Sequence, residues 1–237
     1  AYDDADGDVY WDTPLGRGRP GWHIECSAMS TKYLGEHFDI HTGGVDLTFP
    51  HHENEIAQTC GAYPHEHFVN LWMHCEHLLV DNQKMSKSLG NFYTLRDLLT
   101  KGYDPKAIRY LLLASHYRNK LNFSLKSIEE AGKAISKIQN TLDRVLENLN
   151  YDLNLTKENG YSKEHLTEFL EALADDLNTS KAVGTIFEFL KIINTNLDSN
   201  SIGKDELADL LSYFTKINGL LGILEFSKKE DSLDSEI

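Results

Sequence analysis

The segment FDIHTGGVDLTFPHHENEIAQTC, residues 38–60, contains the pattern that decides the fold class. The β-prone run Phe38–His41 leads into the glycine pair Gly43-Gly44, which is typical of a strand that enters a tight loop. Pro50 then predicts the first position of a helix that runs to about Cys60. A strand, a loop and a helix in this order indicate an α/β domain.

The flanking segments continue this alternation of strands and helices. Residues 23–34 carry apolar side chains at helical spacing, and Gly35 follows as a C-terminal cap. The other expected elements of this portion are two short β-prone runs and two capped helices: 69–73, 78–81, 95–101 and 105–116. Because strands alternate with helices, we predict a mainly parallel sheet.

The pattern changes after Ser124, where apolar residues recur at helical spacing in four successive segments. The expected helices of this region are 128–149, 166–177, 182–193 and 207–221. Polar connections separate them, which predicts a bundle with antiparallel neighbours. The expected domains are therefore 1–123, a helical bundle over 124–226 and a polar tail over 227–237.

Composition limits the class of protein. The chain has 237 residues, of which 41% are hydrophobic and 25% are charged, and this balance excludes wholesale disorder. The net charge of −14 argues against a protein that coats nucleic acid by charge alone. Because all three cysteines and ten of the eleven histidines precede residue 121, we expect the chemistry in the first half.

Several features favour a cytoplasmic protein. No apolar run reaches the roughly 18 residues that a membrane-spanning helix needs, and no secretory signal is visible at the beginning of the sequence. Three cysteines cannot form a disulfide framework, so a reducing compartment is expected.

A candidate metal site lies at the start of the helix that Pro50 opens. His51 and Glu55 are four residues apart, so their side chains share one helical face, and the thiolate of Cys26 would complete a set of S, N and O donors that suits zinc. The alternative is a helix N-terminus with dipole-stabilising carboxylates and a small buried thiol. Spacing alone favours this alternative.

A second constellation is the string Lys-Met-Ser-Lys-Ser over residues 84–88, which a glycine follows at Gly90. Two ammonium groups in a flexible loop can close on a polyphosphate and stabilise the charge that develops there. A solvated basic turn is the alternative, and the specificity of the string argues against it. We expect residues 84–90 to be exposed and mobile when no polyphosphate is bound.

These residues resemble a known family. The string over residues 84–88 is the signature of class I aminoacyl-tRNA synthetases. Residues 21–29, 41–55 and 72–74 closely resemble the cysteinyl-tRNA synthetases, and the similarity extends through 116–124 into the helical region.

The resemblance implies a Rossmann-type parallel-sheet portion over 1–123, which is the C-terminal part of a class I catalytic domain with a stem-contact region, followed by an α-helical bundle over 124–226 that binds tRNA. It also implies roles for individual residues. Cys26, His51 and Glu55 match the family's zinc ligands, which overturns the preference drawn from spacing. The remaining matched residues are expected to act on ATP or on the amino acid: Lys84 and Lys87 on ATP, Gly43, Gly44 and Asp46 near adenosine, and Trp22 in the wall of the amino-acid pocket, although a core tryptophan is equally compatible with the sequence.

The implied activity is ATP- and Mg²⁺-dependent ligation of L-cysteine to tRNA(Cys) by a protein expected to be a monomer. Two alternatives stay open: the cysteine ligase of mycothiol synthesis, and a non-catalytic truncated paralogue that binds tRNA. The family's His-Ile-Gly-His motif, its fourth zinc ligand and its C-terminal end have no counterpart here. The chain therefore resembles the central part of such an enzyme, and we expect it to be inactive alone.

Because the net charge is negative, contact with tRNA should be local. Arg109, Arg118 and Lys120 lie at the end of the helix from Pro105 or just after it, and His116 should share a face with Arg109. Dipole stabilisation at a solvated helix end is an equally good interpretation of the sequence. The family's stem-contact region at this position favours contact with the tRNA backbone.

Overall fold

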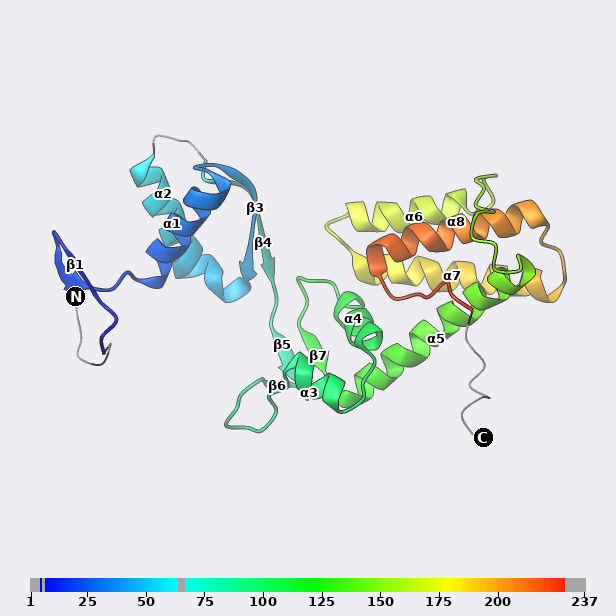
Figure 1. Cartoon of the computed structure of the whole chain (residues 1–237), viewed down its shortest axis with the longest axis horizontal. Helices are drawn as coiled ribbons and strands as arrows, with labels where there is room; N and C mark the ends of the chain where they lie inside the picture. The colour runs from blue at the N-terminus through cyan, green and yellow to red at the C-terminus, as the bar shows by residue number, and fades with distance from the viewer. Residues whose placement is uncertain (1–4, 6, 64–66, 229–237) are drawn as a thin grey trace, which may run out of the picture. The chain divides into compact units, whose positions relative to one another are not determined.

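The computed structural model describes residue 5 and residues 7–63 and 67–228. The chain divides into two compact units, Ala1–His77 and Leu78–Ile237, which are described separately (Figure 1). Within the described residues, no helix combines the length and the hydrophobicity that crossing a membrane requires.

The first unit is built on a pair of parallel strands, β3 (Phe38–Gly44) and β4 (Val69–Cys75). Their register places His41 opposite Trp72 and Gly43 opposite His74. The unit also contains two helices and an antiparallel hairpin: α1 (Trp22–Leu34), α2 (Glu53–Ala62), β1 (Trp11–Thr13) and β2 (Gly16–Gly18). A small apolar core joins the sheet to the inner face of α2, and its members are Phe38, Phe68 and Val69, with Ile56, Cys60 and Trp72 packed against them.

The helix predicted to begin at Pro50 begins later. A 3-10 turn over Val45–Leu47 and a helical turn over Thr48–His52 precede α2, and Phe49 interrupts that turn with extended backbone angles of φ −137° and ψ 133°. Regular helical geometry therefore starts at Glu53 and continues to Ala62. His51 lies just before the helix, but it stays one turn from Glu55.

The second unit begins with a three-stranded sheet in the order β6-β5-β7. Strand β5 (Leu78–Val80) pairs in parallel with β7 (Leu121–Phe123) and antiparallel with β6 (Gln83–Lys84). Two short helices lie between β6 and β7: α3 (Leu95–Thr100) and α4 (Pro105–Leu113). As expected, a Thr94–Asp97 capping box begins α3 and Asp104 caps α4.

Helix α4 is shorter than predicted, because it ends at Leu113 rather than near His116. The chain then turns, with the backbone N–H of Asn119 donating to the carbonyl of His116 at 2.8 Å. The prediction that His116 shares a helical face with Arg109 is therefore wrong.

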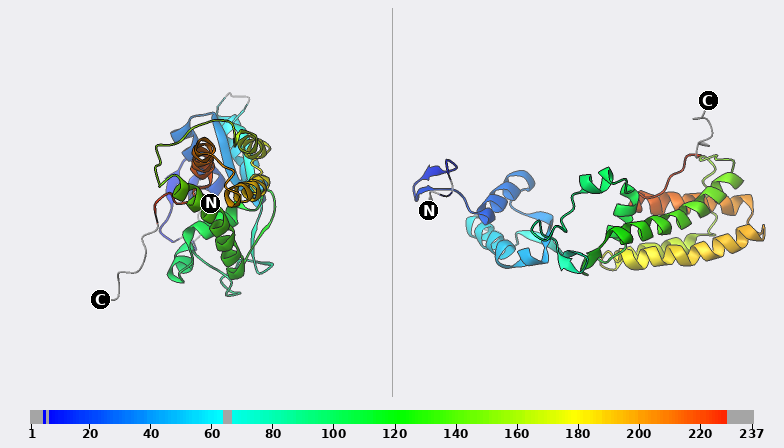
Figure 2. Two further views of the ribbon diagram at one scale, coloured as in Figure 1. Left: turned by 90° about the vertical axis from the view of Figure 1, so that its right-hand side faces the viewer. Right: turned by 90° about the horizontal axis from the view of Figure 1, so that it is seen from below.

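The rest of the second unit is the predicted helical bundle, whose helices run alongside one another in Figures 1 and 2. Its members are α5 (Leu125–Asn148), α6 (Lys163–Ala174), α7 (Thr179–Asp198) and α8 (Lys204–Leu221). One apolar core runs from Val80 and Phe123 in the sheet to Leu142 and Phe214 in the bundle. The α/β class with a helical C-terminal region is thus confirmed, whereas the functional boundary at 123/124 lies inside this unit and stays a prediction.

Candidate metal centre

The structure brings Cys26, His51 and Glu55 together. Cys26 comes from α1, His51 from the turn before α2 and Glu55 from the first turn of α2. One ligand atom of each residue lies within 4.8 Å of the others. Sulfur, imidazole nitrogen and carboxylate oxygen are the donors that tetrahedral zinc accepts, so the three side chains fit such an ion.

Glu55 is the most informative member of this group. Its side chain is fully buried, and neither carboxylate oxygen has a hydrogen-bond partner, although His51 Nε2 lies 2.8 Å from Oε1. Burial raises the pKa of this carboxyl to about 7. A buried carboxylate that receives no hydrogen bond is costly, and a coordinated cation would offset that cost.

The surroundings of Cys26 keep its thiol protonated unless a cation is near. Burial raises its pKa most, and the charges of Glu55 and Glu25 raise it further, against a smaller lowering by the Trp22 side chain. Since only the thiolate binds a metal, these surroundings do not favour a reactive free thiol. They favour a thiol that loses its proton when a metal arrives.

His51 is held by a second imidazole on the side away from Glu55. Its Nδ1 lies 2.7 Å from Nδ1 of His23, so one of these nitrogens donates and the other accepts. For His51 Nε2 to bind a metal, the proton must be on its Nδ1 and must point to His23, which is how outer groups commonly fix a ligand's tautomer. Burial, and next the neighbouring His23, lower the pKa of His51, which keeps the ring neutral and able to ligate.

Trp22 lies beside this group. Its ring centroid is 4.2 Å from that of His51, and 59% of the residue is exposed. The alternative of a core tryptophan does not fit this exposure, and the predicted role in an amino-acid pocket stays a prediction.

Sequence reasoning missed a second group that shares Glu55. His41, His52 and Glu55 also offer ligand atoms within 4.8 Å of one another, and His41 Nε2 lies 3.4 Å from Glu55 Oε2. Burial is the main cause that lowers the pKa of both histidines, that of His52 to about 4, and His52 Nδ1 lies 2.8 Å from His74 Nε2. The strand register of β3 and β4 creates this arrangement, and the concentration of histidines before residue 121 was its only sequence signal.

The glycine pair at the end of β3 allows neighbouring side chains to lie close to the backbone of this strand. A Cβ atom at Gly43 would lie 2.7 Å from Cε1 of His52, and one at Gly44 would lie 2.5 Å from Oδ1 of Asp46. Packing therefore favours glycine at Gly43, where the added atom would meet the ring of buried His52, whereas the Asp46 side chain beside Gly44 is exposed and can move away. The predicted contact of Gly43, Gly44 and Asp46 with adenosine stays a prediction.

In the second unit, the Lys-Met-Ser-Lys-Ser string begins at Lys84, the last residue of β6, and continues as an exposed loop anchored at two points. Met85 packs against the core, and the Asn91 side chain closes the loop: its Oδ1 accepts from Ser86 N at 2.8 Å and its Nδ2 donates to the carbonyl of Lys84 at 3.2 Å. Lys84 and Lys87 are exposed. Most of the loop is exposed, as expected, and its mobility stays a prediction. The part played by Asn91 in closing the loop was missed by sequence reasoning.

The predicted tRNA contacts have different surroundings. Arg109 Nε donates to the carbonyl of Leu221, and its Nη2 lies 3.4 Å from the carbonyl of Leu220, so this guanidinium caps the C-terminal end of α8. Arg118 forms an ion pair with Asp176, and Lys120 is exposed. Contact of these three residues with tRNA stays a prediction.

Comparison with known families agrees with this geometry. Residues 3–133 match the catalytic domain of the class I (C) tRNA synthetases, and residues 168–225 match the DALR domain. The chain belongs to the class I tRNA synthetase (C) family. The predicted family is thus confirmed.

Three relatives are named cysteine–tRNA ligase. The protein of Leptospira interrogans is 56% identical over 98% of this chain and 50% of its own length. The proteins of Brachyspira hyodysenteriae and Chlamydia felis are 48% and 43% identical, over 100% and 99% of this chain and over 50% and 49% of their own lengths. The chain therefore spans about half the length of the curated relatives it matches.

Two solved structures share the fold. The ternary complex of the agnB2 LeuRS of Agrobacterium radiobacter K84 with tRNA and LeuAMS aligns with a TM-score of 0.64 at 13% identity, over 92% of this chain and 33% of that one. A putative arginyl-tRNA synthetase from Campylobacter jejuni aligns with a TM-score of 0.52 at 15% identity, over 95% and 60%. At these identities the likeness concerns the fold alone.

Proposed function

We propose that the chain is part of a cysteine–tRNA ligase, which activates cysteine with ATP and transfers it to tRNA(Cys). The observation that carries the proposal is the convergence of Cys26, His51 and Glu55. It occurs in a chain that belongs to the class I tRNA synthetases and is 56% identical to a protein named cysteine–tRNA ligase.

The three donors would hold zinc with one position left for a further ligand. A bound zinc ion would supply a soft Lewis acid that prefers a substrate thiolate to the hydroxyl of serine. Shape alone discriminates poorly between two such small side chains, because one small group is worth only about 1–3 kcal/mol. The chain's own part is to fix the three donors, to orient His51 through His23 and to present Trp22 beside the site.

Lys84 and Lys87 would bind the phosphates of ATP. In the activation step, an oxygen of the cysteine carboxylate attacks the α-phosphorus of ATP, and the bond to pyrophosphate breaks. The two ammonium groups, with Mg²⁺ on the phosphates, would neutralise the charge that builds up on the departing pyrophosphate. A ribose hydroxyl of tRNA then attacks the carbonyl of the adenylate, and AMP leaves.

The test uses the purified full-length protein. Pyrophosphate exchange should depend on cysteine and not on serine, and the protein should then transfer cysteine to tRNA(Cys). Transfer to an amino sugar instead would identify the ligase of mycothiol synthesis. Absence of exchange from a folded, zinc-loaded protein would leave only a tRNA-binding paralogue.

A further inference from the structure

Glu55 has two carboxylate oxygens, and the metal group of Cys26 and His51 accounts for one of them. Oε1 lies 2.8 Å from Nε2 of His51, whereas Oε2 lies 3.4 Å from Nε2 of His41. The side chain is fully buried, and neither oxygen receives a hydrogen bond. A metal ion held by Cys26, His51 and Oε1 would therefore leave Oε2 buried without a partner.

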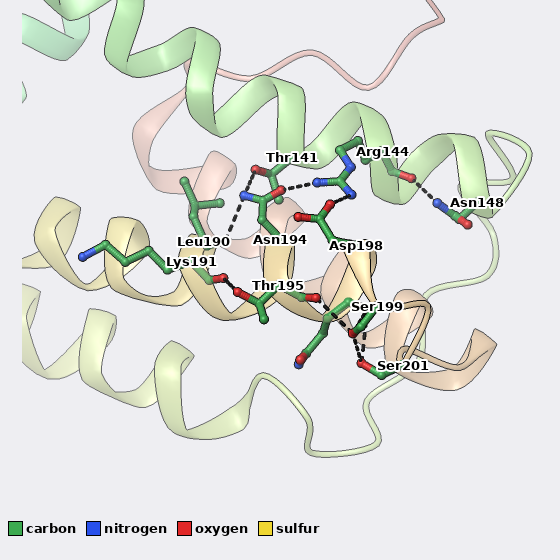
Figure 3. Close-up of polar contacts among 11 residues, drawn as sticks. Thr141, Arg144, Asn148, Leu190, Lys191, Asn194, Thr195, Asp198, Ser199 and Ser201 are labelled. Atoms are coloured by element: carbon green, nitrogen blue, oxygen red, sulfur yellow. Dashed lines mark hydrogen bonds and ion pairs between the residues drawn. The ribbon is translucent and has the colours of Figure 1, made fainter.

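Other buried polar groups show how this chain usually satisfies them. Asp209 is the other buried carboxylate in the part of the chain that the structure describes. It accepts hydrogen bonds from three backbone N–H groups, those of Asn159, Gly160 and Ser162. In the helical bundle, Asn194 Nδ2 donates to the buried hydroxyl of Thr141 at 2.9 Å, and Figure 3 shows these two side chains pointing toward each other. Because Glu55 has no such donors, a cation is the partner that each of its oxygens lacks.

Two further histidines offer ligand atoms beside Glu55. His41 lies in β3 and His52 just before α2, and one nitrogen of each lies within 4.8 Å of the other and of a Glu55 oxygen. Their rings meet edge to face, with centroids 4.8 Å apart. Two histidines and one glutamate are a known three-ligand set for zinc, and this set contains no sulfur.

His74 can fix the ring of His52 as His23 fixes that of His51. His52 Nδ1 lies 2.8 Å from His74 Nε2, so a proton on Nδ1 can point to His74 and leave His52 Nε2 able to bind a metal. Gly43 leaves space beside that nitrogen, because a Cβ at this position would lie 3.0 Å from His52 Nε2. Each of the two groups therefore contains an imidazole that a second imidazole orients.

We propose that His41, His52 and the second oxygen of Glu55 form a further metal site, which binds a borderline divalent cation such as zinc, cobalt or nickel. Glu55 then bridges two ions, one through Oε1 and one through Oε2. Proteins contain such two-metal sites with ions about 3.5–4 Å apart. The second ion should bind more weakly than the first, because its ligand set lacks a thiolate and because the two ions share the charge of Glu55.

The experiment counts the metal ions that the full-length protein binds, with Co²⁺ as the probe because its absorption spectrum depends on its ligands. Metal-free protein is titrated with Co²⁺, and equilibrium dialysis gives the number of bound ions. The first ion should produce the charge-transfer band of a thiolate–cobalt bond. The second ion should add visible absorption without further charge transfer, since its ligands include no sulfur.

Two charge-matched double variants locate the second ion. His41→Asn/His52→Asn should bind one Co²⁺ instead of two, and its charge-transfer band should remain, which also shows that the first group is still assembled. His37→Asn/His77→Asn removes two exposed histidines of the same unit. This control for binding at surface imidazoles should keep both ions.

Two single variants test the ligands and the outer partner separately. Cys26→Ser should still bind a sulfur-free ion at the second group, without the charge-transfer band. His74→Ala removes only the partner of His52, and it should weaken the second ion about 10- to 100-fold while the first ion binds as before. Equal weakening of both ions in His74→Ala would give this residue a merely structural role.

A wild-type protein that binds a single Co²⁺ even at millimolar concentration would overturn the proposal, because one ion would then take both oxygens of Glu55. A second ion that persists in His41→Asn/His52→Asn, or that is lost in the surface control, would overturn it as well. The count in the wild type requires no substitution, so it decides the matter even if a variant does not fold. The proposed function rests on the first ion and is not affected by these outcomes.

Discussion

Arg118 binds Asp176 through two nitrogens, with Nε 2.6 Å from Oδ2 and Nη2 3.2 Å from Oδ1. The hydroxyl of Tyr117 donates to Oδ1 of the same carboxylate at 2.5 Å. Asp176 itself lies in the connection between α6 and α7, at a positive φ of 54°. The segment after α4 is therefore bound to the helical bundle at the carboxylate of Asp176, and this carboxylate engages the guanidinium of Arg118.

The contacts of the Asp176 carboxylate should be visible in the pH dependence of stability at acid pH. Hydrogen bonds from Arg118 first, then from Tyr117, lower its pKa from 3.8 to about 2. Because the folded-state pKa is depressed, the stability it contributes is present above about pH 4 and is lost as the pH falls through about 2. Asp176→Asn should lower the Tm at pH 7 by no more than about 3 °C, since the pair is exposed, and should remove part of the acid-side loss. Thermal unfolding between pH 2 and 7 measures both, and an unchanged acid limb would contradict the assignment.

Arg109 should behave as a capping residue of α8. Arg109→Ala removes the donors to the carbonyls of Leu220 and Leu221, which should cost about 1 kcal/mol of the free energy of unfolding. The expected fall in Tm is about 2–4 °C. Arg96→Ala, an exposed arginine on α3, is the control. A normal Tm together with a salt dependence of tRNA binding flattened by about one unit would instead make Arg109 a phosphate contact.

Part of this structure could be predicted from the sequence, because it depends on local spacing. His51 and Glu55 meet because about four residues make one helical turn. Ser124 begins α5 because a serine side chain can accept a hydrogen bond from the backbone N–H three residues later, here that of Ser127. Cys26 could not be placed by spacing, because its position depends on how α1 packs against α2, so only the family resemblance indicated it.

Most of the features that were missed depend on long-range contacts; Asn91 is the exception, because it bonds Ser86 and Lys84 five and seven residues away. His41 and His74 join the site through the register of two strands that lie about thirty residues apart in the sequence. Arg118 and Asp176 are 58 residues apart, and no local pattern indicates their pairing. Charge together with the family's stem-contact region made Arg118 a candidate for tRNA contact, because the sequence does not show which cations are already neutralised.

Zinc affinity should depend on pH in a way that identifies the ligands. Binding must displace a proton from Cys26, whose pKa is raised, and below about pH 7 a second proton from Glu55. The logarithm of the affinity of the full-length protein should therefore rise with a slope near two below pH 7 and near one above it. Competition with a chromophoric chelator between pH 6 and 8 measures this slope.

Glu55→Gln should keep the slope near one throughout and weaken zinc binding at least tenfold. Glu53→Gln is the control, because Glu53 is an exposed residue of the same helical turn. A slope of two retained in Glu55→Gln would show that Glu55 does not lose a proton to the metal.

The lysine loop should act on the chemical step. Lys87→Ala should slow cysteine-dependent pyrophosphate exchange about 100-fold, the size typical of a lost charge-stabilising group, with the KM for cysteine changed by less than threefold. Lys101→Ala, an exposed lysine just after α3, is the charge-matched control. An exchange rate equal to that of the control would remove Lys87 from the mechanism.

Asn91 should support the same step by holding the loop. Asn91→Ala removes the bonds to Ser86 N and to the carbonyl of Lys84. We expect a smaller loss of exchange, about tenfold, because Lys87 is kept but its loop loses one of its two anchors. Exchange rates for the two variants and the double variant show whether the losses are coupled; fully additive losses would mean that Asn91 does not act through the loop.

Gly43 provides the sharpest test of the crowding around the histidines. The Cβ of Gly43→Ala would lie 2.7 Å from Cε1 of His52 and 3.1 Å from Cδ1 of Leu47, so the His52 ring must move. This should cost about 1–3 kcal/mol of the free energy of unfolding and should weaken zinc binding, because His52 packs beside His51 and His41. Gly61→Ala is the matched control: it lies inside α2 with nothing within 4 Å of the added Cβ, and the helix propensity of alanine should stabilise it by up to about 1 kcal/mol. If the close approach of Gly43 and His52 is real, chemical denaturation shifts the stabilities of the two variants in opposite directions, and chelator competition shows weaker zinc binding only in Gly43→Ala. Equal behaviour would show that β3 gives way without disturbing the site.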